Sequence, residues 1–121
     1  MPKQILVIED NRDNREILCD LLTSVGYAIL EATTGHQGVC AAVTHCPDLI
    51  LMDIHLPGMD GYEATRRIKA HPARGHIPII AVTSYALSGD DVKAFEAGCD
   101  GYVAKPFDPR TLLATLRTYL A

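Results

Sequence analysis

The chain has 121 residues, of which 48% are hydrophobic and 21% charged, and its formal net charge is −4. These values predict one globular domain over residues 1–121 and exclude a largely disordered chain. The negative balance and the scattered Lys and Arg disfavour nucleic acid as a direct partner, and no apolar run reaches the roughly 20 residues of a membrane span.

Five short apolar runs recur along the chain. Most are uninterrupted, whereas a strand with one face in water would alternate apolar and polar residues. We therefore predict parallel strands that are covered on both faces. The runs are Ile5–Ile8, Ala28–Leu30, Leu49–Met52, Ile77–Val82 and Tyr102–Ala104.

Helix signals separate the first three runs. Apolar residues between Ile17 and Val25 recur at helical spacing, and Gly26 follows as a stop signal. The segment from Gly35 to Cys46 has the weakest helical pattern of the chain, and its predicted inward face consists of three small apolar residues. These are Val39, Ala42 and Val43.

Helix start signals also mark the second half. Asp60 is a candidate N-cap, and Ser88 with Asp91 three residues later resembles a capping box. Asp108 followed by Pro109 is a start signal for the last helix. Five strand–helix units in succession predict an α/β fold, an open, right-handed, doubly wound parallel sheet with helices on both faces.

Polar side chains follow four of the predicted strands. Glu9 and Asp10 end the first, Asp53 the third and Thr83 the fourth, and the fifth runs into Lys105. Doubly wound folds bind ligands at the carboxyl ends of their strands, so these residues are expected to converge there. Three carboxylates a few Å apart repel one another, and at least one should have a raised pKa unless a cation intervenes.

A hard divalent cation with oxygen ligands resolves this repulsion, and Mg²⁺ fits best. With that ion present, a carboxylate oxygen of Asp53 is expected to attack phosphorus and form an acyl phosphate. Lys105 would contact a phosphoryl oxygen as a compact cation. The hydroxyl of Thr83 would donate a hydrogen bond to the same group.

Five motifs, in order and at matching spacing, carry a resemblance to a known family. They are Val7–Asn11, Leu49–Gly61, Pro78–Thr83, Gly98–Tyr102 and Lys105–Phe107. The chain resembles the receiver domain of two-component response regulators, of the single-domain kind found in chemotaxis, over essentially its whole length. The resemblance implies a flavodoxin-like sheet with strand order 2-1-3-4-5, and a phosphoacceptor rather than an enzyme.

The resemblance also implies site roles and partners. Glu9 and Asp10 would hold Mg²⁺ together with Asp53 and the backbone carbonyl of His55. The phosphoryl donor would be a phospho-histidine on a sensor histidine kinase or a histidine phosphotransfer protein. The Lys105–Pro106 peptide bond would be cis, which aims the lysine at the site.

A switch is implied as well, in which the Thr83 hydroxyl turns toward the phosphoryl group and Tyr102 moves inward behind it. A tyrosine that merely packs half-buried is the alternative for Tyr102. The fourth helix, fifth strand and fifth helix would bind a downstream protein, and two copies could pair through the same face. The sequence ends with that helix, so we expect no output domain in the chain.

Two positions depart from common choices of the family. His55 lies two residues after Asp53, and Tyr85 lies two residues after Thr83. A bulky imidazole and a phenol there are expected to shield the acyl phosphate from water and slow self-dephosphorylation. Arg12 and Arg15 follow the acidic pair, and either present charge to a docking kinase or form a solvated helix face.

Two other function classes fit less well. Phosphatases of the haloacid dehalogenase type need a second Asp two residues after the nucleophile, where this chain has His55. Flavin-binding electron carriers need a Ser-, Thr- or Gly-rich phosphate loop after the first strand, where the residues from Glu9 to Arg12 include two acids. An acidic loop repels phosphate unless a metal is present.

Four cysteines are scattered along the chain, namely Cys19, Cys40, Cys46 and Cys99. Two disulfides would be the alternative, but no pair has CxxC spacing, so we expect buried free thiols. The N-terminus lacks the layout of a signal peptide. A cytoplasmic location is therefore predicted.

Overall fold

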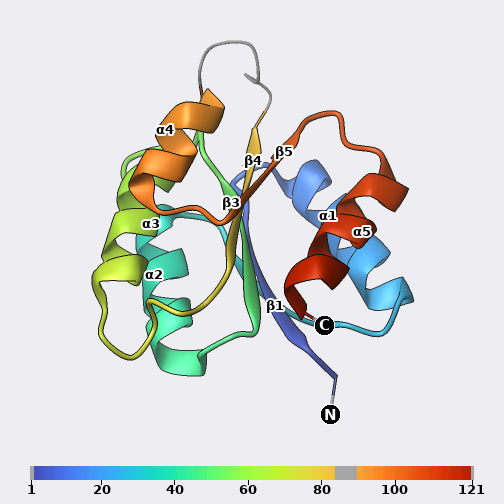
Figure 1. Ribbon diagram of the computed structural model, residues 1–121. Coiled ribbons are helices and arrows are strands. Elements are labelled where there is room, and N and C mark those ends of the chain that lie inside the picture. Colours follow the sequence, from blue (N-terminus) through green and yellow to red (C-terminus); the bar gives the residue numbers. More distant parts are fainter. Residues whose placement is uncertain (1, 84–89, 121) are drawn as a thin grey trace.

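The computed structural model describes residues 2–83 and 90–120. In these residues five strands alternate with five helices along the chain (Figure 1). The elements are β1 (Gln4–Ile8), α1 (Arg12–Ser24), β2 (Ala28–Ala32), α2 (Gly35–His45), β3 (Leu49–Asp53), α3 (Gly61–Ala70), β4 (Ile79–Thr83), α4 (Asp90–Ala97), β5 (Gly101–Ala104) and α5 (Pro109–Leu120).

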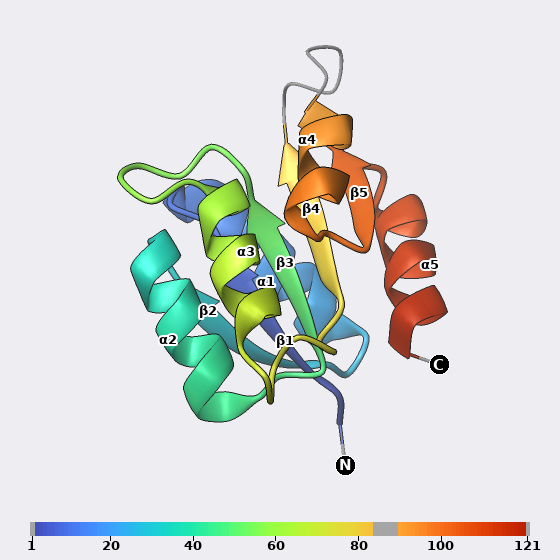
Figure 2. The ribbon, with the colours of Figure 1, turned by 60° about the vertical axis from the view of Figure 1, so that its left-hand side comes forward.

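All strand pairs are parallel, and the sheet has the order β2-β1-β3-β4-β5. Helices α1 and α5 cover one face, and α2, α3 and α4 cover the other, so the molecule has three layers (Figures 1 and 2). The predicted α/β fold and its strand order are confirmed. The order in which strands are added to the sheet reverses between β1 and β3, and such folds place their ligand site at this point.

The two faces of the sheet bury separate hydrophobic clusters. In β1, Leu6 and Ile8 pack toward α2 and α3, whereas Ile5 and Val7 pack toward α1 and α5. Every residue of β3 and β4 is buried. Burial on both faces explains why the apolar runs are uninterrupted.

Strand boundaries differ from the prediction by one or two residues. β4 begins at Ile79 rather than Ile77, because the backbone N–H of Ile77 donates to the carbonyl of Arg74 and so belongs to the preceding turn. β3 extends through Asp53, so the acceptor candidate is the last residue of a central strand.

The apolar spacing identifies α1 but not the width of its buried stripe, and the inward face predicted for α2 is partly wrong. In α1, Leu18 and Leu22 are buried, but Ile17 is 57% exposed. In α2, the predicted Ala42 is buried, whereas the valines are half-buried and Gly38 is buried. A Cβ atom at Gly38 would clash with the side chain of Ile8, so the helix approaches the sheet through a residue that has no side chain.

Two of the predicted caps are confirmed. The Asp60 side chain accepts from the backbone N–H of Glu63 at 2.9 Å, and that of Asp108 accepts from Arg110 at 2.8 Å. Ser88, proposed as a third cap, lies outside the described residues. Among residues 2–83 and 90–120, no helix combines the length and hydrophobicity that a membrane crossing needs.

All four cysteines are free, as expected, but the prediction that they are buried holds for Cys99 alone. Cys40 on α2 and Cys46 at the C-terminal cap of that helix are exposed, and Cys19 is half-buried. Burial is the largest cause that raises the pKa of Cys19 to about 12, followed by the carboxylate of Glu31.

Candidate functional site

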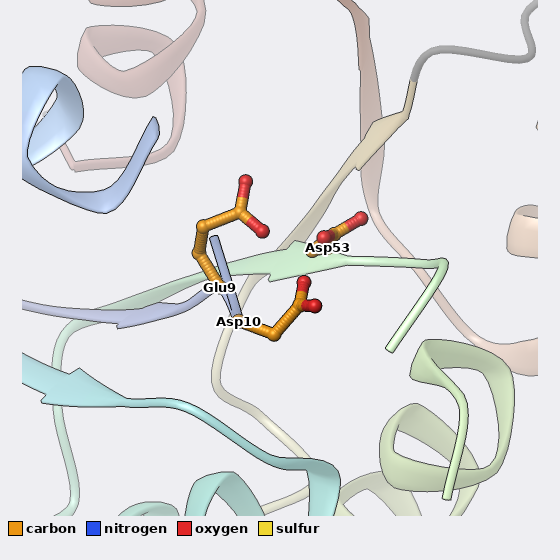
Figure 3. A group of neighbouring side chains, drawn as sticks. All are labelled: Glu9, Asp10 and Asp53. Carbon is orange, nitrogen blue, oxygen red and sulfur yellow. The ribbon is translucent and has the colours of Figure 1, made fainter. Parts of the chain in front are cut away.

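Three acids meet at the carboxyl edge of the sheet. Glu9 and Asp10 directly follow β1, Asp53 ends the neighbouring β3, and their carboxylates face one another (Figure 3). One carboxylate oxygen from each residue lies within 4.8 Å of the others. The convergence predicted from the strand ends is therefore present.

Asp53 is 7% exposed. Its Oδ1 atom accepts a hydrogen bond from the backbone N–H of His55 at 3.1 Å. Burial and the adjacent carboxylate of Glu9 raise the pKa of Asp53 to about 7, against the opposing effect of Lys105. The expected raised pKa among the three acids is thus found at Asp53.

Glu9 is 2% exposed and is held by Lys105, whose Nζ donates to Oε1 at 2.7 Å. Burial favours the neutral form of Glu9, but hydrogen bonds to Asp53 and Lys105 outweigh it and lower the pKa. Lys105 Nζ also lies 3.8 Å from Asp53 Oδ2. Of these two neighbouring acids, therefore, Glu9 holds a negative charge more readily, because its pKa is lowered, and Asp53 holds a proton more readily, because its pKa is raised.

Lys105 reaches this cluster from the edge strand. It follows β5, its peptide bond to Pro106 is cis as expected, and its backbone N–H donates to the carbonyl of Thr83 at 2.7 Å. Thr83 ends β4 and is fully buried. Both residues therefore lie at the same edge of the sheet as the acids.

The chain that follows Asp53 returns close to this residue at the start of α3. The backbone N–H of Gly61 donates to the carbonyl of Ile54 at 2.9 Å, and a Cβ atom at Gly61 would clash with the carbonyl of Asp53. Only a residue without a side chain lets α3 begin this close to β3. The sequence motif contains this glycine, but nothing in the pattern shows what it touches.

Arg15 is a site neighbour whose contacts the sequence does not show. Its Nη1 donates to the backbone carbonyl of Glu9 at 3.0 Å, and its Nε donates to Glu31 on β2 at 3.2 Å. The side chain is 16% exposed, so it is not part of a solvated helix face. Arg12, in contrast, is exposed and pairs with Glu16.

The remaining predicted residues are placed as follows. The side chain of Tyr102 is half-buried and packs against the cluster under α2, α3 and α4. His55 is exposed beside Asp53. Tyr85 lies outside the described residues.

An open groove of about 600 Å³ adjoins the site. It lies between α1 and the segment that joins β5 to α5, and Lys105 forms part of its wall. Most of its lining is apolar, contributed by Ile17, Leu18, Pro106, Phe107 and Pro109.

The donor atoms fit magnesium. Glu9, Asp10 and Asp53 offer only carboxylate oxygens, which are the ligands of a hard cation, and none of the nitrogen or sulfur ligands typical of zinc. Two of the three acids are buried, so their mutual repulsion is weakly screened by water. A divalent cation would relieve it.

Comparisons with known proteins agree with this geometry. The family model of the response regulator receiver domain matches residues 5–117. Relatives named polar-differentiation response regulator DivK, from Brucella anthropi and Brucella ovis, are each 38% identical over 120 residues, which is 99% of this chain and 98% of theirs.

Solved structures are similar over the same length. The receiver domain of a sensor histidine kinase from Pseudomonas aeruginosa, with a magnesium ion coordinated in its active-site cleft, is 39% identical, with a TM-score of 0.94 over 99% of this chain and 98% of that one. A CheY-like receiver domain protein from Methanospirillum hungatei is 33% identical, with a TM-score of 0.90 over 99% and 94%. The chain therefore belongs to the response regulator receiver domain family, the magnesium-dependent phosphoacceptors of two-component signal transduction that act with a cognate histidine kinase.

Proposed function

We propose that Asp53 is the residue that accepts the phosphoryl group, from a phospho-histidine on a sensor kinase or a histidine phosphotransfer protein. The observation that carries the proposal is the cluster of Glu9, Asp10 and Asp53 with Lys105 at its side. Asp53 is the member that ends a central strand, and its Oδ2 lies 3.8 Å from the Nζ of Lys105.

Glu9, Asp10 and Asp53 would hold Mg²⁺ through their carboxylates, together with the backbone carbonyl of His55. When bound, the ion neutralises charge that develops on the transferred phosphoryl group. The backbone N–H of His55 already donates to Asp53, so the acceptor and the proposed carbonyl ligand are held in one short segment.

The transfer itself forms one bond and breaks one. A deprotonated Oδ atom of Asp53 attacks phosphorus, the N–P bond of the phospho-histidine breaks, and its electron pair returns to the imidazole nitrogen. Lys105 Nζ, 2.7 Å from Glu9 and 3.8 Å from Asp53, needs to move little to donate to a phosphoryl oxygen. Its charge then stabilises the product.

Thr83 and Tyr102 would relay the change. The Thr83 hydroxyl would turn toward the phosphoryl group and Tyr102 would move inward behind it, as two populations whose balance shifts. A tenfold shift needs about 1.4 kcal/mol, which one or two charge-assisted hydrogen bonds supply. The proposed read-out face consists of α4, β5 and α5.

That face would bind a downstream protein or pair two copies of the chain. Val92 and Phe95, both on α4, are 56% and 51% exposed. They lie three residues apart and therefore on one side of the helix, which offers an apolar patch to a partner.

The lifetime of the phosphorylated state is proposed to depend on His55 and Tyr85. His55 is exposed and its backbone N–H donates to Asp53, so we propose that its side chain restricts the approach of water. We expect slow self-dephosphorylation, measured as the half-life of phospho-Asp53. A half-life of seconds that His55→Asn leaves unchanged would contradict this role.

The phosphodonor is proposed to rest on the groove between α1 and the β5–α5 segment. Lys105 forms part of the groove wall and contacts Glu9, so a protein seated there lies beside the acceptor. Exposed Ile17 gives the donor an apolar contact. We further propose that residues 1–121 form one receiver domain and that it works in the cytoplasm.

The central experiment is labelling with acetyl phosphate or a phosphorylated kinase, with and without Mg²⁺, in the wild type and in Asp53→Asn. Label is expected in the wild type with Mg²⁺ only. Labelling that persists in Asp53→Asn would overturn the assignment of the acceptor.

A further inference from the structure

Arg15 holds the turn that carries two of the proposed metal ligands. It lies on the second turn of α1, and its side chain folds back over the start of the helix to the carbonyl of Glu9, at 3.0 Å from Nη1. The N–H of the same residue, Glu9, donates to the carbonyl of Ala32 on β2 at 3.0 Å. The backbone of Glu9 is thus fixed on both sides, on one by a strand and on the other by Arg15.

The carbonyl of Glu9 belongs to the peptide unit that joins Glu9 to Asp10. Because a peptide unit is planar, fixing its oxygen also fixes the direction in which the chain enters Asp10. Asp10 is exposed, whereas Glu9 and Asp53 are buried. The position of the Asp10 carboxylate therefore depends strongly on this peptide unit.

Glu31 fixes Arg15 in turn. The Nε and Nη1 atoms of Arg15 donate to two different acceptors, Glu31 Oε1 at 3.2 Å and the Glu9 carbonyl at 3.0 Å. This is a use of the rigid guanidinium fork that a lysine ammonium cannot reproduce. Arg15 is 16% exposed, so the arrangement is held among packed neighbours.

We propose that Arg15 is a positioning residue for the metal site, which keeps Glu9 and Asp10 at the spacing that Mg²⁺ needs, and that Glu31 orients it. This inference rests on the proposed function, because it assumes that Glu9 and Asp10 are metal ligands. Residues that hold metal ligands in place typically account for a 10- to 100-fold difference in affinity.

The direction in which Arg15→Met changes the affinity for Mg²⁺ distinguishes a positioning role of Arg15 from a purely electrostatic one. A guanidinium next to Glu9 opposes the binding of a second cation, so loss of its charge alone would strengthen Mg²⁺ binding. Loss of the fixed peptide unit would weaken it. Arg15→Met therefore tests two mechanisms that predict opposite results.

The experiment is a calorimetric titration of the intact chain with MgCl₂, below the unfolding temperature of every variant. Arg15→Met is expected to raise the Mg²⁺ dissociation constant about tenfold, and Arg15→Lys by less. Arg12→Met is the matched control, because it removes the same charge from the exposed Arg12–Glu16 pair, and it is expected to leave the constant unchanged.

Glu31→Gln gives a second test. It is expected to weaken binding in the wild type and to have no effect in the Arg15→Met background, because Glu31 is proposed to act through Arg15. A purely electrostatic effect of Glu31 would persist in both backgrounds. Should Arg15→Met fail to fold, Arg15→Lys and Glu31→Gln carry the test.

Asp10→Asn distinguishes failure of the role of Arg15 from failure of the proposed set of metal ligands. If Asp10→Asn abolishes binding while Arg15→Met leaves it unchanged or tighter, the role of Arg15 is overturned and the ligand set stands. If Asp10→Asn has no effect, or the wild type binds no Mg²⁺, the ligand set falls and the role of Arg15 falls with it.

Discussion

Two lysine–carboxylate pairs lie at opposite ends of the sheet, and both have an N–O distance of 2.7 Å. At the carboxyl ends of the strands, Lys105 donates to Glu9; at the amino ends, Lys69 of α3 donates to Asp100, which precedes β5. The same chemistry serves different purposes because the surroundings differ.

Around Lys69 the hydrogen-bonding groups are matched. Its ammonium has three donors and contacts three acceptors, which are Asp100 Oδ2 and the carbonyls of Gly75 and Ile77. Asp100 also accepts from the N–H of Ile79, and its carbonyl accepts from the hydroxyl of Tyr119. These hydrogen bonds connect α3, β4 and α5 at the amino ends of the strands.

Around Lys105 the charges are not matched. Three carboxylates share the site with this lysine, and burial together with the adjacent Glu9 raises the pKa of one of them, Asp53, to about 7. A site with surplus negative charge favours the binding of a cation. A lysine that lies near two acids can exchange one carboxylate for another anionic group at little cost. The matched pair stabilises the fold, and the unmatched pair is available for chemistry.

The comparison predicts its largest effect for Lys105→Met. Lys105 is proposed to stabilise the transferred phosphoryl group, so loss of its charge is expected to slow phosphotransfer about 100-fold, the size seen when one such donor is removed. The measurement is the rate of label transfer from a phosphorylated kinase. A variant that transfers at the wild-type rate would show that Lys105 is structural, like Lys69.

Lys69→Met is expected to lower the stability of the fold and to leave phosphotransfer almost unchanged. It leaves Asp100 and two carbonyls without their donor and should lower the free energy of unfolding by about 2 kcal/mol, or the Tm by about 10 °C. Thermal denaturation checks this value. Phosphotransfer at 20 °C should stay within twofold of the wild type, and a larger loss would break the comparison.

Below pH 7 the unmatched site should lose Mg²⁺ affinity, by about tenfold per pH unit, because Mg²⁺ has to displace the proton of Asp53. In metal-free protein the same raised pKa means that the folded state binds more protons than the unfolded chain between about pH 4 and 7. Its contribution to stability therefore falls as pH rises through this window.

Titration with MgCl₂ in two buffers of different ionisation enthalpy measures the proton released. Asp53→Asn should release none, and its metal-free stability should lack this pH dependence. An equal proton release from Asp53→Asn would assign the proton to another group.

The smallest expected effect concerns the groove beside Lys105. Ile17→Glu is expected to slow transfer from the kinase several-fold while leaving acetyl phosphate labelling unchanged, because the small donor needs no docking surface. Val25→Glu is the control, since Val25, at the C-terminal cap of α1, is also exposed but does not line the groove. Equal effects of both substitutions would place the docking surface elsewhere.

The fold and the cluster at the strand ends could be predicted because they depend on local patterns. An uninterrupted apolar run indicates a strand covered on both faces, and the residue after it has to lie at the sheet edge. Glu9, Asp53 and Lys105 are found by that rule alone. The raised pKa of Asp53 also follows, because buried carboxylates that lie close together disfavour the charged form of at least one of them.

Other features could not be predicted, because they depend on distances between elements. The helical spacing of α1 does not say how wide its buried stripe is, and Ile17 falls outside it. The valines of α2 are the more hydrophobic residues, but Gly38 is buried against Ile8 of the sheet while the valines are half-buried. The contact of Arg15 with Glu31 joins residues 16 positions apart, and nothing in either neighbourhood indicates it.

The ion pair between Glu9 and Lys105 joins residues 96 positions apart. Glu9 directly follows β1, and Lys105 directly follows β5, the last strand of the sheet in chain order. A nascent chain whose β5 is still inside the ribosome already contains all three acids, but Lys105 is not yet available to pair with Glu9. The acidic cluster thus gains its lysine only when β5 has been added to the sheet, so the proposed phosphoacceptor site is complete only after this last strand has folded.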